Sequence, residues 1–233
     1  MTTTPRQVGR ARSIPRQRQG VSARDEILEA AAGLFSEHGY AATSTRSIAL
    51  AVGIKQASLY YHFANKEDIL AGLLEGTVQP SLSFATRLGR SGQPPQVQLY
   101  ALTRFDVELL LSGRWNVGAL YQLPEVRADR FTGFRRERGR LREAYGRRIV
   151  AGIRDQVFHH VESPKVITKL VFALAESVIA MRGDYPIPDP LPLANTVAAA
   201  CLRLLSCAQD DLAEAVTQSA GLLEKATYPP RKS

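Results

Sequence analysis

Apolar residues recur three and four positions apart along most of this 233-residue chain, as they do on one face of an α-helix. No stretch shows the strict alternation of a half-buried strand. The pattern therefore predicts an all-α fold. Beyond residue 65 the expected helices are 66–90, with a kink or break at Pro80, and then 95–112, 116–123, 125–158, 165–182, 193–207 and 210–225, with loops at 92–95 and 183–192.

The stretch 45–64 has the pattern of two short helices joined by a tight turn. Gly53 lies where the chain must reverse, a place that favours a residue tolerating positive φ. Ala49 lies where the helices would cross, and Phe63 is expected to face inward. The apolar positions that the two helices would share are Ile48, Val52, Ile54 and Leu59. This is the pattern of a helix-turn-helix, whose second helix lies in the major groove of DNA.

Polar residues mark the expected starts of the helices in this region. Ser22 is a suitable N-cap for a first helix, and Ser44 for the first helix of the pair. Ser47 replaces the Glu that would complete the capping box of Ser44. Asn65 is expected to cap the helix that follows.

Positive charge is concentrated in two segments. The net charge is +8, which indicates a polyanionic partner. Residues 1–24 contain six Arg and no acid, and residues 125–154 contain ten Arg and four acids, so each segment carries +6 and the remainder carries −4. Residues 1–21 contain little to bury and are expected to be disordered. Their Arg10, Arg12, Arg16 and Arg18 suit an arm that follows the minor groove, or else a solubilising tail.

The second helix of the pair carries the candidate base contacts. Gln56 can pair with adenine through two hydrogen bonds, or be a solvated helix residue, and Ala57 can pack on a thymine methyl. Lys55 can reach guanine or a phosphate. The remaining candidates for backbone or base contacts are Thr45, Arg46, Ser58, Tyr60, Tyr61 and His62.

Residues 22–75 resemble the TetR family of bacterial transcriptional regulators. The residues that carry the resemblance are Gly39-Tyr40, Thr43-Ser44, Arg46, Ile48-Ala49, Val52-Gly53-Ile54, Ser58 to Phe63 and Lys66-Glu67. It implies a dimeric repressor, without catalysis, that binds a palindromic operator in double-stranded DNA. It also implies backbone contacts for Tyr60, His62 and Lys66. Lys55 departs from the family, which usually has a capping Ser there; the lost cap is worth ~1 kcal/mol.

The resemblance also implies a division of the chain into an arm (1–21), a helix-turn-helix domain (22–75) and a helical regulatory and dimerisation domain (76–233). The helices 165–182 and 193–207 are apolar over wide faces, which either a deep core or a four-helix bundle between two subunits explains. In the family the last two main helices form that bundle, which favours a homodimer.

Segments 43–63, 109–126 and 177–191 also resemble those of nitrogen-control repressors of actinobacteria within the family. That resemblance implies control of ammonium-uptake, urea and other nitrogen-assimilation genes, and release from DNA by an adenylylated PII-type signal protein. The alternative is a small-molecule inducer bound in the C-terminal domain, where Tyr100, Phe105, Trp115 and Tyr121 would line a pocket or form core. The basic helix 134–148 is either a solvated face with a buried stripe or a docking surface for an acidic partner.

Other function classes find little support in the sequence. There is no Ser/His/Asp set, P-loop or GxGxxG motif, so neither an enzyme nor a bound cofactor is expected. No Cys/His cluster has metal-ligand spacing, and Cys201 and Cys207 are too far apart on one helix for a disulfide. No apolar run approaches the ~20 residues of a membrane span, and no secretory signal is present, so a cytoplasmic protein is expected. A non-specific nucleic-acid binder is the competing class.

Overall fold

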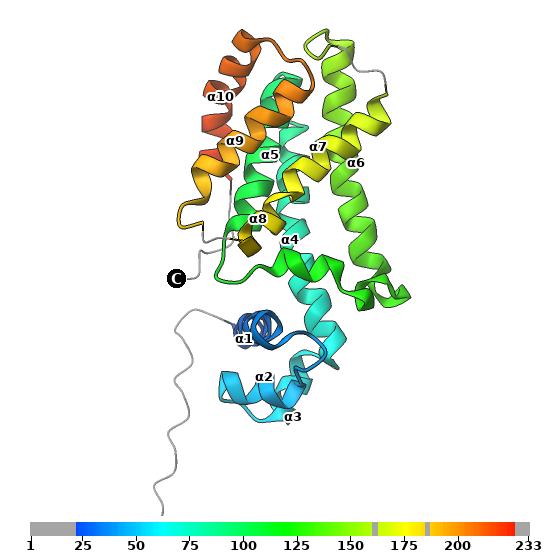
Figure 1. The fold of residues 1–233 in the computed structure, drawn as a ribbon, viewed down its shortest axis with the longest axis vertical. Helices are drawn as coiled ribbons and strands as arrows, with labels where there is room; N and C mark the ends of the chain where they lie inside the picture. The colour runs from blue at the N-terminus through cyan, green and yellow to red at the C-terminus, as the bar shows by residue number, and fades with distance from the viewer. Residues whose placement is uncertain (1–21, 160–162, 185–186, 227–233) are drawn as a thin grey trace, which may run out of the picture. The chain divides into compact units, whose positions relative to one another are not determined.

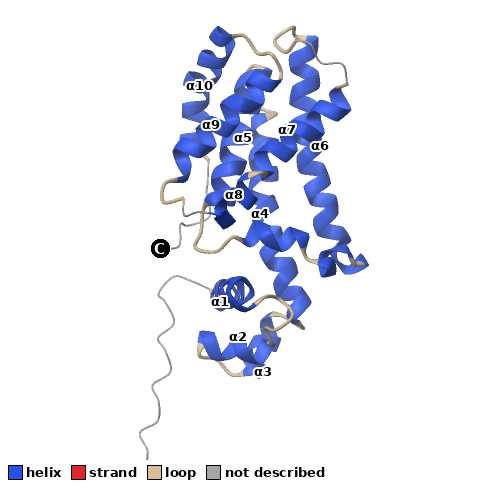
Figure 2. Cartoon of the chain, viewed as in Figure 1, coloured by secondary structure: helices blue, strands red, loops and turns tan. Residues whose placement is uncertain are grey.

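The computed structural model describes residues 22–159, 163–184 and 187–226. The predicted arm, with Arg10, Arg12, Arg16 and Arg18, lies outside these residues. All regular structure in the described part is helical, which confirms the all-α prediction (Figure 1, Figure 2). The chain divides into two compact units between Ile69 and Leu70. None of the described helices is long and apolar enough to cross a membrane.

The first unit contains three short helices and the start of a fourth. They are α1 (Ala23–His38), α2 (Thr45–Val52), α3 (Gln56–His62) and the first residues of α4 (Lys66–Leu88). Gly53 ends α2 in the left-handed conformation, with φ 80° and ψ 24°, as predicted for the reversal. Ile48, Ala49, Leu59 and Phe63 are buried, so α2 and α3 share an apolar face.

Side chains cap three of these helices. Ser22 Oγ accepts a hydrogen bond from the Asp25 amide, and Asn65 Oδ1 accepts one from the Asp68 amide, as expected. The capping box of α2 is complete, although the sequence lacks the expected Glu. Ser44 Oγ accepts from the Ser47 amide, and Ser47 Oγ accepts from the Ser44 amide, each over 3.0 Å. A serine hydroxyl can therefore take the place of the usual carboxylate.

The second unit is built around α5, in which every residue except Pro95, Gln98 and Arg104 is buried. The helices α6 to α10 surround it, and α5 contacts each of them (Figure 1). Besides the rest of α4, the elements of this unit are α5 (Pro95–Leu111), η1 (Val117–Gln122), η2 (Pro124–Arg127), η3 (Asp129–Phe131), α6 (Thr132–Arg154), α7 (Pro164–Glu176), α8 (Val178–Asp184), α9 (Pro190–Leu204) and α10 (Gln209–Glu224).

Several predicted helix boundaries were wrong. The spans 116–123 and 125–131 form short 3₁₀ helices instead of α-helix. The predicted helix 165–182 is divided at Ser177 into α7 and α8. α9 begins at Pro190 because Asp189 accepts a hydrogen bond from the Leu191 amide, which makes part of the expected loop 183–192 helical.

Two further differences concern single residues. α4 continues through Pro80. The carbonyl that loses its partner to Pro80 belongs to Gly76, which is exposed, so water can satisfy it. α6 ends at Arg154, where Gln156 takes a positive φ of 58° and Phe158 folds back against Gly152.

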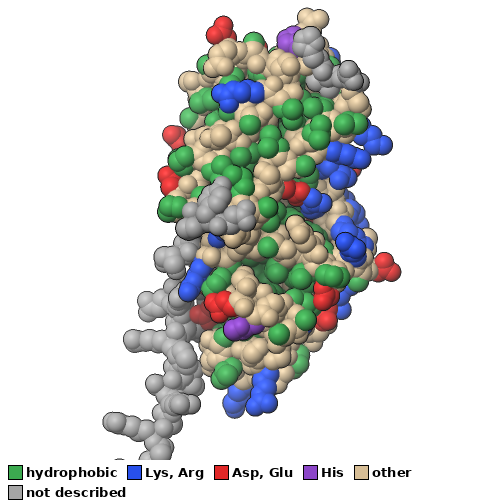
Figure 3. Space-filling view, in the orientation of Figure 1, with side chains coloured by type: hydrophobic (Ala, Val, Ile, Leu, Met, Phe, Trp, Pro, Cys, Tyr) green, Lys and Arg blue, Asp and Glu red, His purple; other side chains and the backbone are tan. Residues whose placement is uncertain are grey.

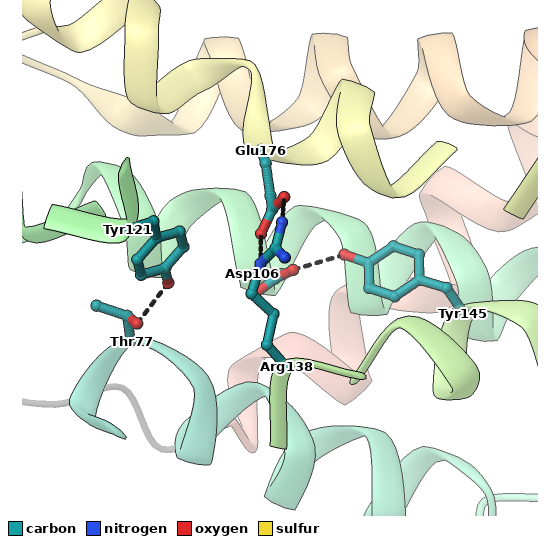
Figure 4. A network of polar contacts seen from close by, with 6 residues as sticks. All are labelled: Thr77, Asp106, Tyr121, Arg138, Tyr145 and Glu176. Atoms are coloured by element: carbon teal, nitrogen blue, oxygen red, sulfur yellow. Dashed lines mark hydrogen bonds and ion pairs between the residues drawn. The ribbon is translucent and has the colours of Figure 1, made fainter. Parts of the chain in front are cut away.

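A polar network lies inside the second unit (Figure 4). Ser81 and Tyr145 both donate hydrogen bonds to the buried Asp106 carboxylate, over 2.7 and 2.8 Å. Arg138 pairs with Glu176, and Tyr121 OH donates to Thr77 Oγ1. Burial raises the pKa of Asp106 to about 6, although both hydroxyl donors oppose that shift. The network joins α4, η1, α5, α6 and α7.

Candidate nucleic-acid interface

The exposed residues at the start of α3 form the centre of the candidate interface. Lys55 is the N-cap residue of α3 and makes no side-chain capping bond, so the departure from the family pattern leaves this helix end uncapped. Lys55, Ala57 and Ser58 are exposed, while Leu59 is fully buried and anchors the helix. Leu59 therefore packs α3 against the core of the first unit, while the opposite side of its first turn is exposed to solvent.

Three predicted contact residues are hydrogen bonded to one another. Gln56 Nε2 donates to Thr45 Oγ1 over 3.1 Å and to Tyr60 OH over 3.2 Å. The two hydroxyl groups share a further hydrogen bond of 3.1 Å. Gln56 and Tyr60 lie one turn apart on α3, whereas Thr45 is the first residue of α2. We call these three residues the Gln56 ring; it joins the N-terminal ends of the two helices.

Charge and exposure around the ring favour an anionic ligand. Residues 39–66 contain three Lys or Arg and no Asp or Glu. Basic side chains gather on the edge of the unit formed by α2 and α3 (Figure 3). Arg46 and His62 are exposed, and Tyr61 keeps 88% of its surface exposed, with its ring in edge contact with His62. Cations, hydroxyls and an imidazole on one acid-free surface suit phosphate oxygens.

Lys66 is engaged differently from the phosphate contact that the family resemblance implies. Its ammonium donates to the carbonyl oxygens of Tyr40 and Thr43 over 2.8 and 2.9 Å, and more weakly to that of Ala41. The same nitrogen lies 4.2 Å from the centre of the Tyr40 ring. A lysine ammonium has three donors, and all are directed at the protein. Lys66 therefore ties the turn between α1 and α2 to the start of α4.

The residues that the sequence predicts as DNA contacts at the start of α3 lie in one region, but sequence reasoning missed how three of them are linked. The spacing of Gln56 and Tyr60 by four residues signals a contact on one helix face. The pairing with Thr45 crosses between helices and has no local signal. The structural role of Thr43 was also missed: its buried hydroxyl donates hydrogen bonds to the carbonyl oxygens of Leu34 and Gly39 and so fixes the turn before α2.

The basic helix α6 has the buried stripe that its sequence predicts. Leu141, Tyr145 and Ile149 form the predicted buried stripe. Several of its arginines form hydrogen bonds within the protein. Arg148, for example, is buried and donates to the carbonyl oxygens of Ala144 and Ala85. Its outer side borders a groove of about 660 Å³ against α7, lined by Arg142, Glu143, Gly146, Arg147, Val150, Pro164, Lys165, Thr168 and Lys169. Docking of an acidic partner there stays a prediction.

Comparison with known proteins gives consistent matches. The profile of the family described as bacterial regulatory proteins, tetR family, matches residues 27–73. The HTH-type transcriptional repressor KstR2 of Rhodococcus jostii is 34% identical over 139 residues, which cover 58% of this chain and 67% of that protein. KstR2 of Mycobacterium tuberculosis is 51% identical over 55 residues, only 28% of its length.

Among solved structures, the crystal structure of Mycobacterium smegmatis AmtR is similar over nearly the whole chain. The two share 44% sequence identity with a TM-score of 0.80, over 92% of this chain and 99% of that chain. The similarity therefore extends well beyond the helix-turn-helix into the second unit.

Proposed function

The chain belongs to the TetR family of bacterial regulatory proteins, and we propose that this repressor binds a palindromic DNA operator as a homodimer and controls nitrogen-assimilation genes. The nitrogen-control assignment rests on the resemblance of three segments to actinobacterial nitrogen-control repressors, and the similarity to AmtR over both units supports it. The KstR2 relatives are similar over a smaller share of this chain, 58% and 24%. A different regulon is accordingly the competing proposal.

The DNA contacts of the proposal fall into three groups. Gln56 and Ala57 read base edges from the first turn of α3. Lys55, Arg46, Ser58, Tyr61 and His62 bind phosphates, which orient α3 without reading sequence. Arg10, Arg12, Arg16 and Arg18 extend the contact into the minor groove. Thr45 and Tyr60 support Gln56, and Lys66 holds the turn in front of α2.

The homodimer is supported by apolar side chains that α7 and α9 leave exposed. Val166 and Leu170 on α7 keep 55% and 52% of their surface exposed, and Leu204 on α9 keeps 45%. α7 and α9 contact each other, so their exposed sides can pair with the same two helices of a second copy. A two-fold pair of helix-turn-helix units matches two half-sites of a palindrome.

For the releasing signal, we propose a PII-type signal protein, on the basis of the resemblance to nitrogen-control repressors. A small molecule bound in the second unit is the alternative. Thermal denaturation with candidate inducers separates the two, because a ligand at 100 times its Kd adds about 2.7 kcal/mol to stability. Stabilisation by a metabolite favours the alternative. Release of operator DNA by an adenylylated PII-type protein, but not by its unmodified form, favours the first.

Selection of genomic DNA by the purified protein tests the regulon. Fragments upstream of ammonium-uptake, urea and nitrogen-assimilation genes should be enriched. Enrichment of fragments upstream of an unrelated gene set instead contradicts nitrogen control while leaving the DNA-binding role intact.

A further inference from the structure

The Gln56 ring restricts what Gln56 can offer to a base. A glutamine amide has two N–H donors and one carbonyl acceptor. In the ring, Nε2 donates to both Thr45 and Tyr60, so both N–H groups are used. Oε1 makes no hydrogen bond within the described part of the chain. The group that remains for DNA is therefore an acceptor oxygen.

The bases differ in how they meet such an acceptor in the major groove. Adenine N6 and cytosine N4 carry amino donors, whereas guanine O6 and thymine O4 are acceptors. An acceptor oxygen binds the first two and is repelled by the other two. The two-bond pair of glutamine with adenine also needs an N–H group for adenine N7. In the ring, that group is already bound to a hydroxyl.

We propose that Thr45 and Tyr60 are positioning residues that fix Gln56 as an acceptor-only reader of an amino-bearing base, adenine or cytosine. The inference rests on the proposed function, since it requires that α3 lie in the major groove of an operator. It differs from the adenine-specific pair expected from the sequence. It also gives Tyr60 a role other than the phosphate contact that the family resemblance implies.

In this proposal, the ring makes the base preference of Gln56 depend on a second helix. Thr45 belongs to α2, and its hydroxyl bonds both to Gln56 and to Tyr60. Removing either hydroxyl releases one N–H of the Gln56 amide. The released group can then reach adenine N7, which cytosine lacks. Loss of a ring hydroxyl should therefore narrow the preference from two bases to one.

The test uses the purified full chain and operator duplexes carrying each of the four bases at the position whose preference Gln56→Ala abolishes. In the wild type, adenine and cytosine should bind within about threefold of each other, and guanine and thymine about tenfold or more weaker. Thr45→Val and Tyr60→Phe should each raise the preference for adenine over cytosine about tenfold. Thr45→Ser keeps the hydroxyl and should retain the wild-type preference. Tyr61→Phe removes a hydroxyl outside the ring that is proposed to bind phosphate, so it should weaken binding to all four duplexes alike and leave the base preference unchanged.

Three results overturn the inference. One is a wild-type preference for guanine or thymine at this position. A second is an adenine-only preference that Thr45→Val and Tyr60→Phe leave unchanged. A third is an equal loss of affinity for all four bases in Tyr60→Phe, which assigns that hydroxyl to a phosphate.

Two controls protect the interpretation. The double variant Gln56→Ala/Tyr60→Phe should show no base preference at this position, as Gln56→Ala alone does; a new preference would overturn the inference. Thermal denaturation of every variant establishes that the helix-turn-helix is folded. A chain that selects no duplex over another refutes the proposed function itself, a result distinct from selection of an operator with the wrong base preference.

Discussion

Lys66 offers a direct test of how the helix-turn-helix is held together. Substitution by Met keeps most of the apolar stem and removes the ammonium group. The change leaves the carbonyl oxygens of Tyr40 and Thr43 without the donor that now binds them at 2.8 and 2.9 Å. It also removes the cation from the face of the Tyr40 ring. The turn between α1 and α2 should therefore loosen.

The expected loss of stability is about 2–3 kcal/mol. A hydrogen bond from a charged donor contributes about 1.5–3 kcal/mol, but Lys66 is only half-buried and water can replace part of each bond. About 1 kcal/mol for each of the two short bonds is therefore appropriate. The cation–π contact adds about 0.5 kcal/mol at such a site.

Two assays separate this role from a phosphate contact. Urea denaturation followed by circular dichroism measures the stability of the full chain. The salt dependence of operator binding measures phosphate contacts, because each one contributes a slope of about 0.9. Lys66→Met should lose stability and retain the wild-type salt slope. Lys55→Met is the matched control. Lys55 is exposed and its side chain makes no hydrogen bond within the described residues, so its replacement should lower the salt slope and leave stability unchanged.

The opposite pattern would refute this reasoning. If Lys66→Met unfolds at the same urea concentration as the wild type and its salt slope falls by about one unit per contact, Lys66 binds phosphate. The three carbonyl contacts would then contribute nothing measurable. Lys66→Arg supplies an intermediate case, since its planar guanidinium keeps the charge but not the geometry of the three bonds.

Three further predictions concern the second unit. Gly152→Ala should destabilise the protein by about 1–3 kcal/mol in thermal denaturation, because the added Cβ would lie 2.2 Å from the Phe158 ring; Gly139→Ala, with nothing within 4 Å, should not. The pKa of Asp106, about 6, lies above the ~3.9 of an unfolded chain, so ionisation destabilises the folded state. The stability of the wild type relative to Asp106→Asn should thus fall by about 3 kcal/mol as pH rises from about 4 to 7 in urea titrations, and a constant difference would contradict the burial argument. Leu170→Asp should yield monomers in analytical ultracentrifugation and weaken operator binding, whereas an unchanged dimer would remove α7 from the proposed interface.

The sequence predicted best those features that depend on neighbouring residues. The start of α1 at Ser22, the reversal at Gly53 and the cap at Asn65 follow from local backbone chemistry, and all three occur in the structure. The burial of Leu59 and Phe63 follows from helical periodicity. Each of these signals lies within four residues of the feature that it predicts.

Features that depend on packing between distant segments could not be predicted in the same way. The short 3₁₀ helices of 117–131 have an apolar spacing close to that of an α-helix, and packing rather than periodicity decides between the two. The link from Thr45 to Gln56 joins two helices, and the contacts of Lys66 reach back more than twenty residues to the turn before α2. The sequence shows that these side chains can form hydrogen bonds, but it does not show which residues they bind.

The preference of the purified 233-residue chain for its selected operator over an unrelated duplex tests the central claim most directly. Competition binding at physiological salt should show the operator bound about 10³-fold or more tightly, with a two-fold symmetric motif in the selected sequences. Affinities within about tenfold of each other would contradict an operator-specific repressor and favour a non-specific DNA-binding protein. A selected motif without symmetry would contradict a dimer that reads a palindrome.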